Sequence, residues 1–177
     1  PPKFTPASSG THLTRNEAMT RVAAIDCGTN SIRLLVADGH IDENGRPQLA
    51  DLTRQMRIVR LGQGVDARGY LDPAAIERTV EATVEYQRMI EALGATRTRF
   101  VATSATRDAS NSADFVRQIK AVIGVEPEVV VGTEEASLSF NGAVSGLGES
   151  VTAPMLVVDI GGGSTELVLG ATRVEQA

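Results

Sequence analysis

The fold of this chain is decided by a stretch that occurs twice. Its two copies are Ile25-Asp26-Cys27-Gly28-Thr29-Asn30-Ser31-Ile32-Arg33-Leu34 and Val158-Asp159-Ile160-Gly161-Gly162-Gly163-Ser164-Thr165-Glu166-Leu167. Asp, Gly, Ser and Leu recur in both copies in the same order and with the same spacing. Each copy consists of an apolar strand, an aspartate, a glycine-bearing turn, a hydroxyl and a second apolar strand. We therefore expect two β-hairpins of one design, far apart in the sequence.

The turns of both hairpins are suited to binding phosphate. Glycine lets backbone N–H groups approach an anion with no Cβ in the way, and successive N–H groups form an anion-binding nest. Hydroxyl side chains beside the glycines add further donors. The candidate phosphate ligands are Gly28, Thr29, Asn30 and Ser31 in the first hairpin and Gly161, Gly162, Gly163, Ser164 and Thr165 in the second.

Glycine-bearing turns of this kind also occur in proteins that bind no phosphate and in nucleotide-binding motifs. Both copies could be ordinary hairpins in which Asp and Gly serve only the turn. A dinucleotide-binding fingerprint is a poorer fit, because Glu166 stands where the third glycine belongs and a strand is expected to follow. A Walker loop is excluded, because no Gly-Lys-Ser/Thr follows.

Each hairpin also carries a carboxylate next to its turn. Asp26 and Asp159 would repel a phosphate if they were bare. They make sense beside one when Mg²⁺ lies between, because Mg²⁺ binds to one or two carboxylates together with substrate phosphates. The sequence therefore predicts a magnesium-dependent phosphate site in which Asp26 contributes to the metal environment.

The remaining sequence predicts an α/β domain. Residues 1–18 are polar and rich in Pro, Ser and Thr, which predicts a disordered extension, with one domain over residues 19–177. Expected strands at 21–25, 31–37 and 49–61 precede elements in which helices and strands alternate. These are helices at 73–93, 112–123 and 133–145 and strands at 99–103, 127–131, 155–159 and 165–169. This order is typical of a layered α/β domain.

The composition of the chain argues against several classes of function. The 177 residues carry a net charge of -5, which argues against sequence-specific nucleic-acid binding and implies that a polyanion is held by local groups. No apolar run approaches the ~20 residues that span a bilayer, so no membrane association is expected. Cys27 is the only cysteine, which favours a reducing, cytoplasmic location.

At these motifs the chain resembles the exopolyphosphatase / guanosine pentaphosphate phosphohydrolase family of the actin-like ATPase superfamily. The resemblance extends to three further segments, Arg60-Leu61-Gly62-Gln63-Gly64-Val65, Ala102-Thr103-Ser104-Ala105-Thr106-Arg107-Asp108-Ala109 and Gly132-Thr133-Glu134-Glu135-Ala136. It implies an actin-like (ribonuclease H-like) domain with a mixed five-stranded sheet and flanking helices. It also implies Mg²⁺-dependent hydrolysis of a phosphoanhydride.

The resemblance assigns roles to individual residues. Glu135 matches the family's catalytic glutamate, which activates water, although its neighbour Glu134 is an alternative. Only one of them can point into a cleft, because successive helical residues lie about 100° apart. Either could instead only stabilise the helix dipole. Asp159 and Glu166 match positions proposed to hold Mg²⁺.

Two arginines are candidate phosphate clamps. Arg33 follows the first turn and Arg107 follows an expected strand, where open α/β sheets place ligands. A guanidinium binds phosphate oxygens in bidentate fashion. Either arginine could instead pair with a surface carboxylate.

Several functions remain open at this stage. The first is an exopolyphosphatase acting on inorganic polyphosphate, and the second removes the 5′ γ-phosphate of guanosine pentaphosphate. A sugar kinase or chaperone-type ATPase of the same fold and a non-catalytic polyphosphate or alarmone sensor are alternatives. Family members carry a second domain after the second hairpin, so we expect a cleft with one wall, weak activity and an exposed interface that permits a homodimer.

Overall fold

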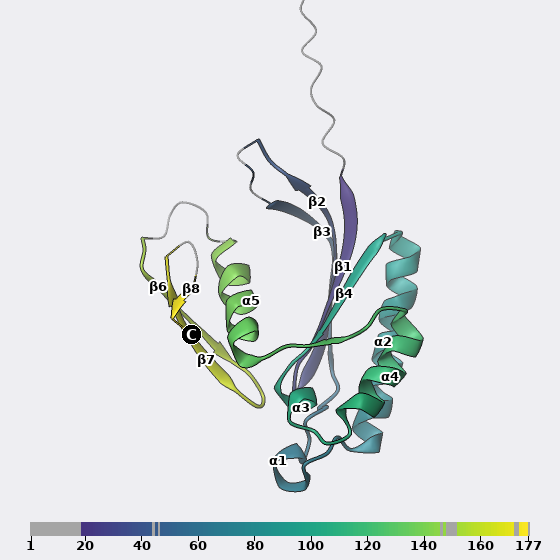
Figure 1. The fold of residues 1–177 in the computed structure, drawn as a ribbon. Helices are drawn as coiled ribbons and strands as arrows, with labels where there is room; N and C mark the ends of the chain where they lie inside the picture. Colours follow the sequence, from purple (N-terminus) through teal and green to yellow (C-terminus); the bar gives the residue numbers. More distant parts are fainter. Residues whose placement is uncertain are drawn as a thin grey trace, which may run out of the picture.

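A mixed five-stranded sheet forms the centre of the molecule (Figure 1). The structure, a computed structural model, describes residues 19–43, 45, 47–145, 147 and 152–171, and the backbone of 174–176. The strands are β1 (Thr20–Cys27), β2 (Ser31–Ile41), β3 (Pro47–Ile58), β4 (Arg97–Ala102) and β5 (Glu128–Val129), in the order β3-β2-β1-β4-β5. β1 pairs antiparallel with β2 and parallel with β4, which confirms the predicted mixed sheet.

Helices cover one face of this sheet. α2 (Pro73–Leu93) begins at the N-cap Asp72, whose side chain accepts from the Ala74 amide, and ends at Gly94 in a left-handed conformation. α4 (Ser112–Ile123) packs beside it. Their apolar stripes and the strands enclose the main core, which includes the fully buried Tyr86, Phe100 and Phe115. The short helices α1 (Val65–Arg68) and α3 (Ser104–Arg107) were not predicted.

A second layer lies on the opposite side of the sheet. α5 (Gly132–Ser145) packs on a separate three-stranded sheet of β6 (Met155–Ile160), β7 (Thr165–Gly170) and β8 (Val174–Gln176). Phe140 and Val168 are fully buried between them. Figure 1 shows α5 and this small sheet facing the side of the central sheet that α2 and α4 leave uncovered.

The repeated sequence is thus divided between two sheets. The first copy forms the β1–β2 hairpin and the second forms the β6–β7 hairpin, each with the predicted turn between antiparallel strands. The prediction of a disordered extension over residues 1–18 lies outside the described residues.

Candidate active site

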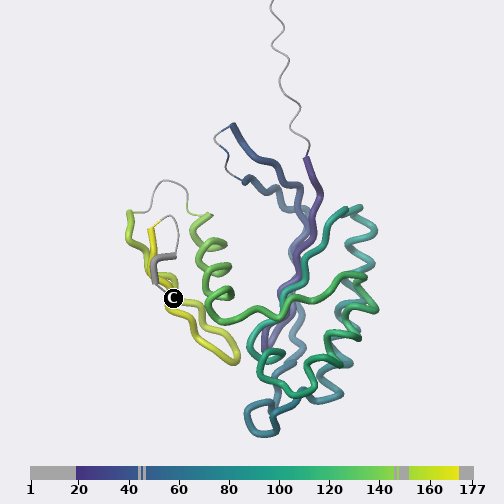
Figure 2. Tube along the Cα trace, in the orientation of Figure 1, coloured from purple at the N-terminus to yellow at the C-terminus, as the bar shows by residue number. Residues whose placement is uncertain are grey.

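The turns of the two hairpins, which we call the first loop (residues 28–31) and the second loop (residues 161–164), lie against each other. A Cβ at Gly162 would lie 3.2 Å from the Asn30 Cβ and 3.3 Å from the Thr29 Cβ. One at Gly163 would lie 2.8 Å from the Thr29 Oγ1. Glycine is therefore required for this close approach, which Figure 2 shows as the yellow-green hairpin bending toward the end of β1.

Both loops have the same hydrogen-bond pattern. The Gly28 amide donates to the Ser31 carbonyl at 3.0 Å, and the Gly161 amide donates to the Ser164 carbonyl at 2.9 Å. The amides at the tips, those of Thr29, Asn30, Gly162 and Gly163, donate to no carbonyl within the described part of the chain. Each loop therefore uses one amide to close itself and leaves its tip amides available to an anion.

The first loop is held in place by two other segments. The Val59 and Arg60 amides donate to the Asn30 carbonyl, and the Gly62 amide donates to the Thr29 carbonyl at 2.9 Å. From the other side, the Thr29 and Ser104 hydroxyls are hydrogen-bonded at 2.9 Å. The sequence segments around Gly62 and Ser104 therefore support the first loop, and this structural role explains two of the motifs that carried the resemblance.

A cleft of about 850 Å³ opens beside the loops, between the central sheet and α5. Both sides contribute to its lining, with residues of β1, β2, β3 and β4 on one side and Glu135, Leu138, Ser139 and Asp159 on the other. Within this chain the cleft therefore has two sides, the second formed by α5 and the β6–β7 hairpin, and the predicted one-walled cleft toward a second domain of the family stays a prediction.

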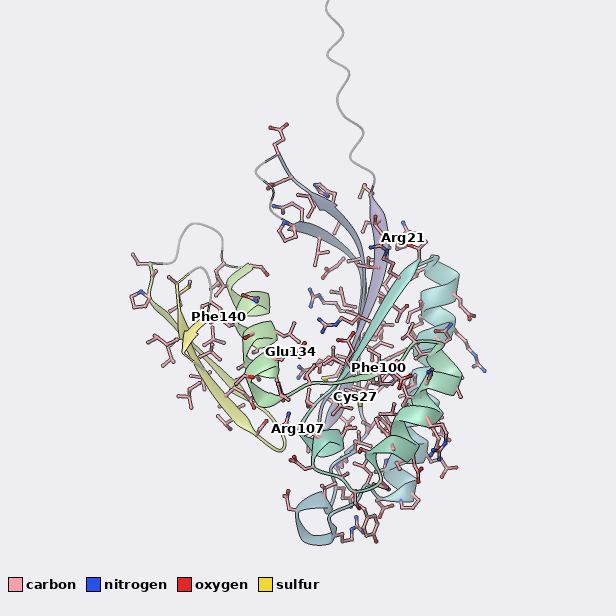
Figure 3. The ribbon with its side chains drawn as sticks, in the orientation of Figure 1. Arg21, Cys27, Phe100, Arg107, Glu134 and Phe140 are labelled. Atoms are coloured by element: carbon pink, nitrogen blue, oxygen red, sulfur yellow. The ribbon has the colours of Figure 1, made fainter. Side chains whose placement is uncertain are left out.

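Glu135 is the acidic residue of α5 that lines this cleft. Its side chain is 16% exposed, and its carboxylate accepts a hydrogen bond from the Arg107 Nη1 at 3.3 Å. Burial raises the pKa of Glu135, and Arg107 opposes that rise. Glu134, labelled on α5 in Figure 3, is 46% exposed and pairs with Arg99 at 3.1 Å, so its surroundings differ from those of Glu135.

Arg107 does not line the cleft. Its Nη1 donates to the Val130 carbonyl at 2.9 Å as well as to Glu135, and its Nε lies 3.7 Å from the Asp108 Oδ1. The guanidinium therefore contacts Glu135 from outside the cleft and orients its carboxylate. Direct binding of phosphate by Arg107 stays a prediction.

Asp26 and Asp159 bring one carboxylate from each sheet into the cleft. Crowding by the surrounding protein raises the pKa of Asp26; Arg33, 3.5 Å away, lowers it, and the charge of Asp159 raises it further. Asp159 accepts a hydrogen bond from the Ser139 Oγ at 2.7 Å. Two carboxylates that repel each other across a cleft fit a divalent cation, which would relieve the repulsion.

Glu166, the third predicted metal ligand, lies on the same face of the second hairpin as Asp159, and its charge raises the pKa of Glu135. It is opposite Asp159 in the β6–β7 register, but it lines a smaller neighbouring hollow together with Thr165 and Thr133. No group of three or more His, Cys, Asp or Glu that could hold a metal is present among the residues described. Asp26 and Asp159 line the cleft, so these two carboxylates could hold Mg²⁺ there together with substrate oxygens and water, and a metal-binding role for Glu166 stays a prediction.

The sequence reasoning missed several residues of the cleft. Arg54, Arg99, Ser104 and Ser139 all line it. The strand pattern could have indicated Arg99, because β4 alternates exposed and buried residues and Arg99 falls on the exposed side. Ser139 could have been found from its spacing, four residues after Glu135 on the same helix.

Two further observations concern Cys27 and the described helices. Burial raises the pKa of the Cys27 thiol, which agrees with packing rather than nucleophilic chemistry. Within the described part of the chain, every helix is too short or too polar to cross a bilayer.

Comparison with known proteins decides the family. Residues 39–177 match the sequence profile of the Ppx/GppA phosphatase family. The chain belongs to this family. The resemblance predicted from the two hairpins is thereby confirmed.

Individual proteins and solved structures are also similar to this chain. Exopolyphosphatase 2 of Mycobacterium tuberculosis is 53% identical over 162 residues, which cover 89% of this chain and 50% of that protein. A solved exopolyphosphatase-like protein is 45% identical with a TM-score of 0.82, covering 89% of this chain and 49% of the other. A Ppx/GppA family member from Aquifex aeolicus is 32% identical with a TM-score of 0.74, covering 90% and 50%.

These likenesses confirm the predicted actin-like fold. The chain spans about half the length of the relatives it matches.

Proposed function

We propose that this chain carries the phosphate-binding half of an exopolyphosphatase, which releases orthophosphate from the end of inorganic polyphosphate with the help of Mg²⁺. The observation that carries the proposal is the contact between the two loops, whose tip amides are free of protein partners in the described residues. An anion is the partner that such amides bind best. The 53% identity to an exopolyphosphatase supports polyphosphate as the anion.

The reaction needs a water molecule that is oriented and deprotonated as it attacks the terminal phosphorus. Glu135 is the proposed base, because it lines the cleft and its raised pKa makes it a better proton acceptor than an ordinary glutamate. Arg107 positions its carboxylate through the 3.3 Å hydrogen bond.

The charge of the substrate is met by several groups. The tip amides of both loops and the hydroxyls of Thr29, Ser31 and Ser164 bind the terminal phosphate, and Arg33 binds an adjacent oxygen. When bound, Mg²⁺ neutralises phosphate charge, and Asp26 and Asp159 would hold it. We place the protein in the cytoplasm, where the thiol of Cys27 stays reduced.

Binding and phosphate release by the chain test this proposal. Isothermal titration calorimetry with tripolyphosphate should show binding that strengthens with Mg²⁺, and prolonged incubation with long-chain polyphosphate should release orthophosphate at a low rate. Glu135→Gln should abolish release and keep binding, whereas Glu134→Gln, the matched control, should keep both.

Each alternative function predicts a different outcome. Unchanged release by Glu135→Gln would place the base elsewhere. Tight binding with no release by the unaltered chain would favour a polyphosphate or alarmone sensor. Faster phosphate release from guanosine pentaphosphate than from polyphosphate would make the nucleotide the substrate.

A further inference from the structure

The cleft continues beyond the loops along the central sheet, and the strand register fixes which side chains form its floor. Two rows of residues cross the uncovered face of the sheet. The row nearer the loops is Met56, Arg33, Asp26 and Val101, and the next row is Arg54, Leu35, Ala24 and Arg99. All eight residues line the cleft.

Three arginines are the only cationic side chains among the described residues that line this floor. Arg33 lies in the first row, and Arg54 and Arg99 lie at opposite ends of the second. The rows are about 7 Å apart, and three strand spacings put Arg54 and Arg99 about 14 Å apart at their backbones. Their side chains therefore flank a path that leads from the loops into the cleft.

Each arginine already has an exposed carboxylate partner. Arg33 pairs with Asp26 at 3.5 Å, Arg54 with Asp51, and Arg99 with both Glu128 at 2.6 Å and Glu134 at 3.1 Å. Exposed ion pairs of this kind contribute little to stability. A polyphosphate carries charged oxygens at every repeat. It can therefore replace the carboxylates as the partner of these guanidinium groups with little loss of folding stability.

The rest of the floor distinguishes between two kinds of polyanion. Ala24 and Leu35 lie between Arg54 and Arg99, and no aromatic side chain is present among the described residues that line the cleft. A nucleobase is usually held by stacking on an aromatic ring, which this floor lacks. A linear chain of phosphates needs only the cations.

We propose that Arg33, Arg54 and Arg99 form an elongated subsite for the internal phosphates of polyphosphate, while the loops hold its terminal phosphate. This inference rests on the proposed function and adds to it a basis for preferring long chains. It also explains how a protein with a net charge of -5 binds a polyanion, since these three cations are gathered in one cleft.

The test compares ligands of two lengths on the 177-residue chain. Affinities for tripolyphosphate and for long-chain polyphosphate are measured over a range of salt concentrations with Mg²⁺ present. The variant is Arg54→Gln combined with Arg99→Gln. The matched control is Arg88→Gln, which removes an exposed arginine from α2 on the other face of the sheet.

In the double variant, affinity for long-chain polyphosphate should fall about tenfold. Its dependence on salt should weaken by about 0.7 per arginine in the slope of log K against log salt. Tripolyphosphate affinity should change less than twofold, and the control should behave like the unaltered chain. Unaltered unfolding midpoints in all variants would show that the fold is kept.

Three results would overturn the inference. Equal losses for both ligands would mean that the arginines act on the loops, and no loss for either would mean that they do not contact the chain. A selective loss for guanosine pentaphosphate would assign the subsite to a nucleotide. Absence of binding by the unaltered chain would remove the proposed function itself, which distinguishes that failure from the others.

Discussion

Substitution of Gly163 by alanine tests the contact between the two loops. The new Cβ would lie 2.8 Å from the Thr29 Oγ1 and 2.9 Å from the Ser104 Oγ. Gly163 does not have the positive φ that would disfavour alanine, so its backbone conformation accepts the substitution. Steric conflict with the first loop is therefore the main cost of the substitution.

The size of the effect follows from these contacts. Both hydroxyls must move, which breaks their 2.9 Å hydrogen bond and costs about 1 kcal/mol. Overpacking of a close contact adds about 1–3 kcal/mol. The loops can avoid this cost by separating, and about 2 kcal/mol spent in this way lowers the affinity for a phosphate held by both loops about 30-fold.

Calorimetric titration with tripolyphosphate measures this loss. Gly142→Ala is the matched control, because its added Cβ would meet no atom within 4 Å beyond the neighbouring α5 backbone, and alanine favours the helix. Its affinity should equal that of the unaltered chain. If Gly163→Ala binds tripolyphosphate as well as the control does, the reasoning that the two loops share one phosphate is refuted.

Three further predictions concern single side chains. Because burial raises the pKa of Glu135, its contribution to folding is greatest below the ordinary glutamate pKa and is lost as pH rises through the raised value. Glu135→Gln should therefore unfold at higher denaturant than the unaltered chain at pH 7 and at the same denaturant in acid; a deficit at pH 7 would contradict this. Arg107→Gln should raise the Glu135 pKa further, as followed by carboxyl NMR, because Arg107 opposes the effect of burial; a lower pKa would show that Arg107 does not act on it. Tyr86→Phe should cost about 1–2 kcal/mol in urea unfolding, because the buried hydroxyl donates to the Ile32 carbonyl at 3.0 Å; an unchanged stability would mean that this hydrogen bond has no net value.

Local features of the fold were predictable from the sequence. Helix α2 was predictable from the N-cap Asp72, Pro73 and the terminal Gly94, because each of these residues acts on the backbone within a few positions of itself. The two hairpins were readable because apolar strands flank glycine turns. The mixed five-stranded sheet came from the family resemblance, and the structure confirms it.

Features that depend on distant parts of the chain were not predictable. The second hairpin was assigned to the same domain as the first, but the structure places it on a separate three-stranded sheet with its own core around Phe140. The cleft arginines Arg54 and Arg99 are 45 residues apart in sequence and share one row only through the register of four strands. Pairing register depends on tertiary packing, so no local pattern contains this information.

The site likewise has features that could be predicted from the sequence and features that could not. The spacing of two adjacent glutamates indicated that only one could face a cleft, and the structure brings Glu135 to it. The place of Glu166 in a second hollow beside Thr133 could not be predicted, because it depends on how β7 lies against the start of α5. The catalytic and metal-binding roles stay predictions.

Amide resonances followed by ¹H–¹⁵N NMR during titration with tripolyphosphate and Mg²⁺ test most directly whether both loops bind one phosphate. The amides of Thr29, Asn30, Gly162 and Gly163 should shift together and give one dissociation constant. Shifts confined to one loop, or two different constants for the two loops, would contradict the shared site.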